Sequence, residues 1–170
     1  MGVAWMELSQ KTIEHFRNPQ NVGEIENPEG TGSILNPICG DRTVIYMRIK
    51  EGIIEDAKFL SFGCAVTIAS ASVFTQKIKG RDIFQLLKGS DDEIISRLVS
   101  LIESELGEIP PAKLHCPPAT VQVFLEATSE YLEKTGANEW SSRIRGLIPR
   151  VSHYYKRGEE KGEEVNGAAP

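Results

Sequence analysis

The chain has 170 residues, of which 40% are hydrophobic, so it is long enough to form one domain with a core of its own. Its 19 basic and 24 acidic side chains give a net charge of −5, which argues against a nucleic-acid-binding protein. It has no run of 18 apolar residues and no basic region followed by an apolar stretch at its start, so we expect neither a membrane span nor a secretory signal.

The first third of the chain predicts one helix and a small antiparallel sheet. A helix over 8–18 should end before Pro19, because the residue before proline is disfavoured in helical conformation. Residues 18–40 are rich in Gly, Asn and Pro, which favours a loop with one short edge strand. The segments with strand character are 32–35, 43–50 and 53–61. Glu51-Gly52 should be the turn of a hairpin, with Ile45, Met47 and Ile49 facing the core.

The remainder predicts helices. The expected helices are 65–79, a short one from Asp82 to Lys88, 91–106, 117–134 and a weaker one over 139–147. In the first of them, one face carries Cys64, Ile68, Ala71, Thr75 and Ile78. Ser90 and Glu93 form a capping-box pattern at the start of another. A sheet followed by helices indicates the α+β class, and the charged tail from Lys156 predicts disorder.

The three cysteines all lie where one predicted element gives way to the next. Cys39 precedes a strand, whereas Cys64 and Cys116 each precede a helix. Helix N-termini stabilise the thiolate, which is the form that binds metals and acts as a nucleophile. An odd number of cysteines without an export signal favours free thiols in the cytoplasm over a disulfide framework. The residues alone leave open both a shared metal or reactive-thiol site and three ordinary buried thiols.

Asp41 and His115 are the candidates for a fourth ligand. Each lies within two residues of a cysteine, and three thiolates leave one position open in a tetrahedral site. Alone, an Asp after Gly is most often a turn residue, and a lone His is most often a surface or core group. A carboxylate is a harder and weaker ligand than sulfur for iron or zinc. Such a site suits a cluster that must leave better than a permanent electron-transfer centre.

Several segments taken together resemble the IscU/NifU-type iron–sulfur cluster assembly scaffolds. They are His15–Pro19, Asn21–Gly23, Asn36–Asp41, Gly52–Phe59, Phe62–Ala65, Ile68–Ser72 and Ile109–Cys116. The resemblance implies an α+β domain over 1–135, with a small antiparallel sheet of about three strands packed against several helices. We expect a C-terminal helical extension over 136–155, as a helix over the core or a partner-binding surface, and a disordered tail over 156–170. The extension carries Trp140, Arg143, Arg145, Tyr154 and Tyr155.

The resemblance implies a scaffold that assembles a labile 2Fe–2S cluster from iron and persulfide sulfur and transfers it to apo-proteins, without being an enzyme itself. The implied ligands are Cys39, Cys64 and Cys116, with Asp41 or His115 as the labile fourth ligand or its helper. Cys116 matches the persulfide acceptor. The implied partners are a cysteine desulfurase, apo-protein acceptors and an electron donor such as a ferredoxin. A homodimer is one expected form of the cluster-bound chain, and no membrane partner is expected.

The run Ile109-Pro110-Pro111-Ala112-Lys113 resembles the Leu-Pro-Pro-Val-Lys element that an Hsp70-type chaperone, working with a co-chaperone, grips in related scaffolds. The alternative is a plain loop that orients Cys116. We give both interpretations equal weight, because proline runs are common in loops and Ile and Ala replace the Leu and Val of the element.

Two other functions compete with the scaffold. Cys64 and Cys116 lie farther apart than in the chaperone-served branch, which favours a zinc-binding sulfur acceptor of the SufU type, whereas His115 argues against that branch. Pro117-Pro118 also departs from the family pattern and removes two backbone N–H donors next to Cys116. A thiol enzyme with Cys116 as nucleophile and His115 as base ranks lowest, because adjacent residues rarely hydrogen-bond to each other and no orienting third group is evident.

Overall fold

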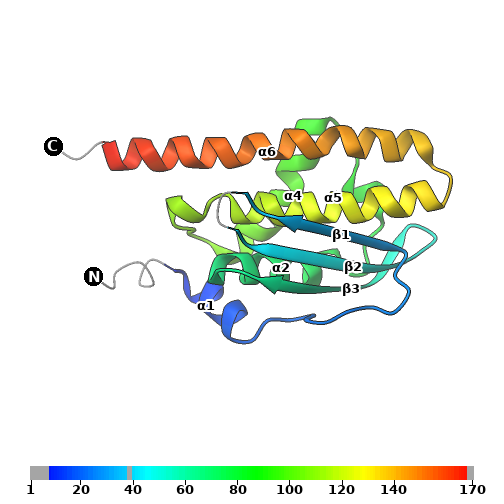
Figure 1. Ribbon diagram of the computed structural model, residues 1–170, viewed down its shortest axis with the longest axis horizontal. Helices are drawn as coiled ribbons and strands as arrows, with labels where there is room; N and C mark the ends of the chain where they lie inside the picture. Colours follow the sequence, from blue (N-terminus) through cyan, green and yellow to red (C-terminus); the bar gives the residue numbers. More distant parts are fainter. Residues whose placement is uncertain (1–7, 38–39, 168–170) are drawn as a thin grey trace.

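A computed structural model describes residues 8–37 and 40–167, and in the last helix it leaves out the side chains of residues 152 and 154–167. The elements in chain order are α1 (Gln10–Arg17), β1 (Gly30–Leu35), β2 (Arg42–Lys50), β3 (Ile53–Phe62), α2 (Ala65–Ile78), α3 (Ile83–Leu86), α4 (Asp91–Leu106), the 3-10 turn η2 (Pro111–Lys113), α5 (Cys116–Lys134) and α6 (Asn138–Gly167). A three-stranded sheet packs against a layer of helices, and α6 lies along the far side of α5 (Figure 1). Within the described chain no helix is both long and apolar enough to span a membrane.

The sheet is antiparallel, with the strand order β1-β2-β3, and this confirms the predicted α+β arrangement. Glu51 and Gly52 form the turn between β2 and β3 with φ angles of 52° and 79°. Two positive φ angles match the twist of the flanking strands, which is why two-residue hairpin turns of this kind are favoured. Along β2, Ile45, Met47 and Ile49 are buried, as their alternation predicted.

Two glycines in β1 allow α5 to approach the sheet closely. A Cβ atom at Gly32 would lie 2.0 Å from the carbonyl oxygen of Val123, and one at Gly30 would lie 2.4 Å from that of Ala127. Both distances are far below a van der Waals contact, so only glycine fits at these two positions. The close approach brings the helix that begins with Cys116 directly against the sheet.

Helix α2 is buried on more sides than its predicted single apolar face implied. It contacts α1, α4, α5 and β3, and ten of its side chains are buried. Ile68, which the helical spacing placed on the core face, is only partly buried, whereas Val66, Ala69 and Val73 are fully enclosed. A helix with neighbours on several sides shows little amphipathicity, so its periodicity is a poor guide to its orientation.

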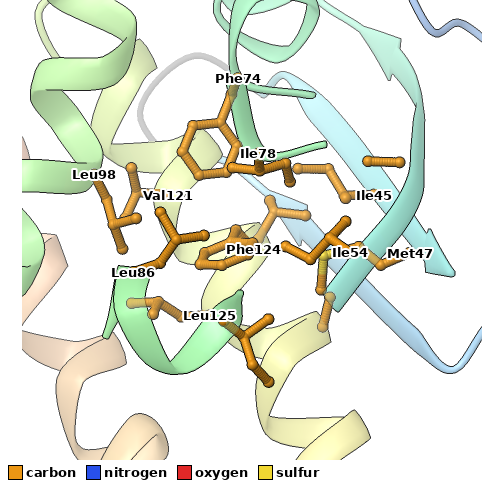
Figure 2. Packing of buried hydrophobic residues seen from close by; sticks show 14 of the residues in the cluster. Ile45, Met47, Ile54, Phe74, Ile78, Leu86, Leu98, Val121, Phe124 and Leu125 are labelled. Carbon is orange, nitrogen blue, oxygen red and sulfur yellow. The ribbon is translucent and has the colours of Figure 1, made fainter. Parts of the chain in front are cut away.

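The core lies between the sheet and helices α2, α4 and α5 (Figure 2). Phe74 of α2 and Phe124 of α5 meet edge to face, with ring centroids 5.2 Å apart. Ile54 contributes from β3 and Leu98 from α4, and both are completely buried. Because α2 and α5 are fixed against each other by this packing, their N-terminal ends are held close together.

Helix α6 is longer than the helix predicted over 139–147. It continues to Gly167, so the backbone of residues 156–167 is helical where a disordered tail was expected. Ile144, Leu147 and Val151 are completely buried in the core that α6 completes. Six of the eleven residues over 157–167 are Arg, Lys or Glu, straight-chain types that extend a helix once it has begun.

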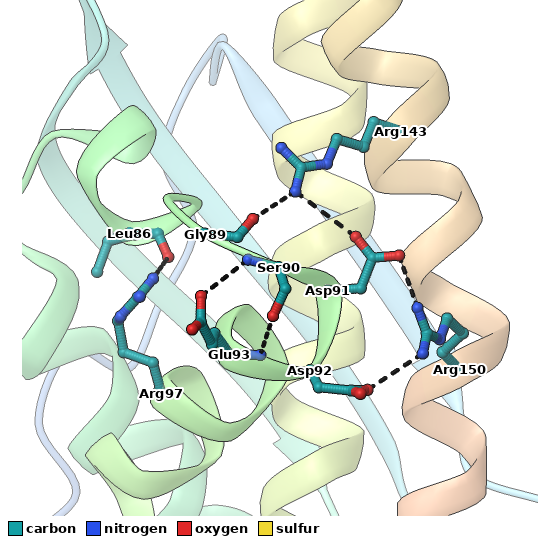
Figure 3. Close-up of polar contacts among 9 residues, drawn as sticks. All are labelled: Leu86, Gly89, Ser90, Asp91, Asp92, Glu93, Arg97, Arg143 and Arg150. Atoms are coloured by element: carbon teal, nitrogen blue, oxygen red, sulfur yellow. Dashed lines mark hydrogen bonds and ion pairs between the residues drawn. The ribbon is translucent and has the colours of Figure 1, made fainter.

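Charged side chains also tie α6 to the first turn of α4 (Figure 3). Arg143 contacts both the Gly89 carbonyl oxygen and Asp91, and Arg150 contacts Asp91 at 2.7 Å and Asp92 at 3.1 Å. The predicted capping box is present, because Ser90 accepts from the Glu93 N–H while Glu93 accepts from the Ser90 N–H. The part of α6 whose side chains are described therefore packs on the core and on α4.

Candidate metal and thiol site

Cys64 and Cys116 meet at one end of the molecule. Cys64 is the residue before α2, after β3 has ended, and Cys116 is the first residue of α5. Their Sγ atoms lie 3.8 Å apart, well beyond the about 2.05 Å of a disulfide bond. Two thiols far apart in the sequence are thus brought together at the N-terminal ends of two helices, where partial positive charge favours thiolate.

Asp41 joins these thiols from the start of β2, next to the end of β3, where Arg42 pairs with Phe62. The backbone N–H of Cys64 donates to Asp41 Oδ2 at 3.1 Å. A Cβ atom at Gly63 would lie 2.6 Å from the Asp41 carboxyl carbon, so the absence of a side chain at Gly63 makes room for the carboxylate. The structure therefore brings together three of the residues that the sequence predicted for the site.

Thr67 lies at the centre of this group, although it was not among the residues predicted for the site. Its hydroxyl donates to Asp41 Oδ2 at 2.6 Å, and its oxygen lies 3.3 Å from Cys64 Sγ and 3.4 Å from Cys116 Sγ. It is 4% exposed. Its position three residues after Cys64 was the signal that could have found it, because side chains near the N-cap and at the third helical position face each other.

The surroundings of Cys64 favour its thiolate at neutral pH. The hydrogen bond from the Cys116 thiol is the largest cause that lowers the pKa of Cys64 to about 5, and burial opposes it. The Thr67 backbone N–H and the positive charge of Lys113 lower this pKa further. Lys113 belongs to the segment that resembles a chaperone-recognition element, so one of its side chains acts electrostatically on the site.

The two thiols differ in exposure. Cys116 is completely buried, whereas Cys64 is partly exposed. The sequence predicted Cys116 just before a helix over 117–134, and the structure includes it in the first turn of α5 with Pro117 and Pro118. The preceding turn η2 has no buried side chain, and Pro111 and Ala112 are exposed. Access to Cys116 therefore requires residues that cover it to move.

The other two predicted ligands are Cys39 and His115. Cys39 lies outside the described residues. His115 is 5% exposed and directly precedes Cys116 at the start of α5. Among the residues that are described, no three His, Cys, Asp or Glu side chains converge closely enough to hold a metal ion. The four-ligand set that the sequence predicted includes Cys39, so it stays a prediction.

Comparison with known proteins agrees with this arrangement. The profile of the NifU-like N-terminal domain family matches residues 7–138. The chain is 39% identical over 128 residues to "Iron-sulfur cluster assembly scaffold protein IscU 1" of Archaeoglobus fulgidus, covering 75% of this chain and 78% of that protein. It is 37% identical over 138 residues to "Iron-sulfur cluster assembly scaffold protein IscU" of Escherichia coli strain K12, covering 78% and 99%.

One solved structure supports the fold. A putative iron–sulfur cluster assembly scaffold protein for the SUF system from Fervidobacterium islandicum AW-1 superposes with a TM-score of 0.50 at 22% identity, covering 76% of this chain and 91% of that one. At this identity the likeness concerns the fold alone. The family match extends over most of the chain and ends where α6 begins. The chain belongs to the NifU-like N-terminal domain family.

Proposed function

We propose that this protein is a scaffold on which a labile 2Fe–2S cluster is assembled and from which it is transferred to apo-proteins. The observation that carries the proposal is the convergence of Asp41, Cys64 and Cys116 around Thr67. The curated relatives, which are named as iron–sulfur cluster assembly scaffolds, support the same function.

The proposed ligands of the cluster are Cys39, Cys64, Cys116 and Asp41. Thiolate sulfur suits iron, and the lowered pKa of Cys64 keeps this residue deprotonated at neutral pH. The carboxylate of Asp41 is the hardest ligand of the set. It is therefore the ligand that water, a proton or an incoming thiol displaces most easily, which suits a cluster that must leave. His115 is the alternative fourth ligand.

We propose Cys116 as the acceptor of sulfur from a cysteine desulfurase. Cys116 passes its proton to the neighbouring Cys64 thiolate, and the resulting Cys116 thiolate attacks the outer sulfur of the persulfide on the desulfurase. A new S–S bond forms on Cys116, and the cysteine thiolate of the desulfurase leaves. Two electrons from a ferredoxin-type donor then convert this sulfur to sulfide. Since Cys116 is completely buried, this step requires the residues that cover it to move. The exposure of Pro111 and Ala112 also fits recognition of residues 109–113 by an Hsp70-type chaperone.

The experiment that tests the scaffold function is anaerobic assembly followed by transfer. The protein is incubated with iron, a desulfurase, cysteine and a reductant, and the product is mixed with an apo-ferredoxin. We expect the absorption of a 2Fe–2S cluster, followed by its appearance on the ferredoxin. A protein that binds only zinc and accepts persulfide, without forming a coloured cluster, would instead be a sulfur acceptor of the SufU type.

Asp41→Ala tests the labile ligand in the same assay. Without the carboxylate, the easily exchanged contact is gone, so we expect the variant to assemble a cluster, to keep it longer in air and to transfer it more slowly. The absorbance decay in air and the rate of ferredoxin loading measure the two effects. Faster cluster loss with unimpaired transfer would contradict the role of Asp41, and a cluster abolished only in His115→Ala would assign the fourth position to His115.

A further inference from the structure

Thr67 is the described residue whose side chain contacts the other three members of the site. Asp41 comes from the segment before β2, Cys64 from the residue before α2, and Cys116 from the start of α5. The Thr67 hydroxyl lies within hydrogen-bond distance of the reactive atoms of all three. Because a hydroxyl has one proton, it can donate to only one of these partners at a time.

The distances indicate which partner receives the proton. The contact with Asp41 Oδ2, at 2.6 Å, is the shortest and has the length of a strong hydrogen bond between a hydroxyl and a carboxylate. The same Oδ2 atom also accepts from the Cys64 N–H, so two donors hold one carboxylate oxygen in place.

We infer that Thr67 is a positioning residue for the metal site and acts through Asp41. Two donors on Oδ2 restrict the orientation of the carboxylate group. Ligating carboxylates are commonly held by such outer hydrogen bonds, whose loss lowers metal affinity about 10–100-fold. This inference rests on the proposed function, because it takes Asp41 and the thiols as ligands.

A purely structural role is the alternative that the test must exclude. Thr67 lies in the first turn of α2 and is almost completely buried, so its substitution could affect packing alone. Thr67→Val keeps the shape of the side chain and removes the hydroxyl, whereas Thr67→Ser keeps the hydroxyl. Thr75→Val is the matched control, since Thr75 is a buried residue of the same helix whose hydroxyl donates to the Ala71 carbonyl oxygen at 2.8 Å.

The experiment measures Zn²⁺ affinity by competition with a chelator, the visible spectrum of the Co²⁺-loaded protein, and the thermal midpoint of the metal-free protein. We expect Thr67→Val to bind Zn²⁺ about 10–100-fold more weakly, with a changed Co²⁺ spectrum that resembles that of Asp41→Ala. Thr67→Ser should restore the affinity to within about threefold. Thr75→Val should leave both metal readouts unchanged, even if its thermal midpoint falls.

The double variant Asp41→Ala/Thr67→Val decides the route of the effect. If Thr67 acts through Asp41, the double variant binds Zn²⁺ as tightly as Asp41→Ala alone. If the loss of Zn²⁺ binding free energy in the double variant equals the sum of the losses in the two single variants, Thr67 acts on the thiols or the helix, and the inference is overturned. So would unchanged Zn²⁺ affinity in Thr67→Val. Absence of Zn²⁺ and Co²⁺ binding by the unmodified chain would overturn the proposed function, and the inference with it.

Discussion

At the scale of single residues, Cys64 and Cys116 are not equivalent, although both were predicted as ligands. Cys64 is partly exposed and has a strongly lowered pKa, whereas Cys116 is buried and donates a hydrogen bond to it. The Cys116 thiol stabilises the Cys64 thiolate by donating a hydrogen bond to it. One charged sulfur in this pair loses less hydration than two charged sulfurs would lose. At neutral pH the pair therefore offers a metal ion one thiolate, that of Cys64.

The lowered pKa predicts how Cys64 reacts with iodoacetamide as the pH changes. In the native metal-free protein its alkylation rate should reach half its maximum near pH 5 and stay level from about pH 6 to pH 9, because only the thiolate reacts. In urea the rate should keep rising toward the ordinary thiol pKa. Mass spectrometry of the labelled peptide measures both. A native rate that rises throughout this range would show that the contacts with Cys116, Thr67 and Lys113 do not stabilise the thiolate.

The same shift has a consequence for stability with a defined sign. The folded-state pKa of Cys64 is below its ordinary value of 9.0, so the unfolded chain binds more protons at this group between the two values. Its contribution to the free energy of unfolding is complete above pH 9, decreases as the pH falls, and is lost below about pH 5. Cys64 should thus stabilise the metal-free protein more at pH 8 than at pH 5.

At the scale of elements, the sequence predicted most helix starts and the three strands, because their signals are local. The capping box of Ser90 and Glu93 and the Glu51-Gly52 turn are examples, since each depends on residues a few positions apart. Thr67 escaped prediction because its strongest partner, Asp41, is 26 residues away. The sequence did not predict the length of α6, because a charged composition such as that after Lys156 is typical of a disordered tail and also of an exposed helix.

Helix α6 should contribute substantially to stability, although it lies beyond the family match. Leu147→Ala removes a completely buried side chain and should lower the free energy of unfolding by about 2–5 kcal/mol. Gly146→Ala is the control next to it. A Cβ atom there meets nothing within 4 Å, so alanine should stabilise the exposed helix by about 0.5–1 kcal/mol. Urea unfolding measures the free energy of unfolding of both variants. If Leu147→Ala lowered it by no more than an ordinary surface substitution does, α6 would not be packed on the core.

At the scale of the whole molecule, the packing explains why the candidate site forms where it does. The sheet supports α2 and α5 on one face, the Phe74 and Phe124 contact fixes these helices against each other, and Gly30 and Gly32 bring α5 close to β1. The N-terminal ends of both helices therefore meet beside Asp41. The outer helix α6 contacts α5 and also η2, the turn just before Cys116. The architecture thus places three proposed ligands, Asp41, Cys64 and Cys116, in contact with the same residue, Thr67.

The central claim is that Cys39, Cys64 and Cys116 bind one cluster together. Anaerobic reconstitution with iron and sulfide of the unmodified chain, of Cys39→Ala, Cys64→Ala and Cys116→Ala, and of Gly146→Ala as a control tests it most directly. We predict a 2Fe–2S absorption spectrum with equal iron and sulfide in the unmodified chain and the control, and its loss in each cysteine variant. Full cluster occupancy in two of the three cysteine variants would contradict a site shared by all three thiols.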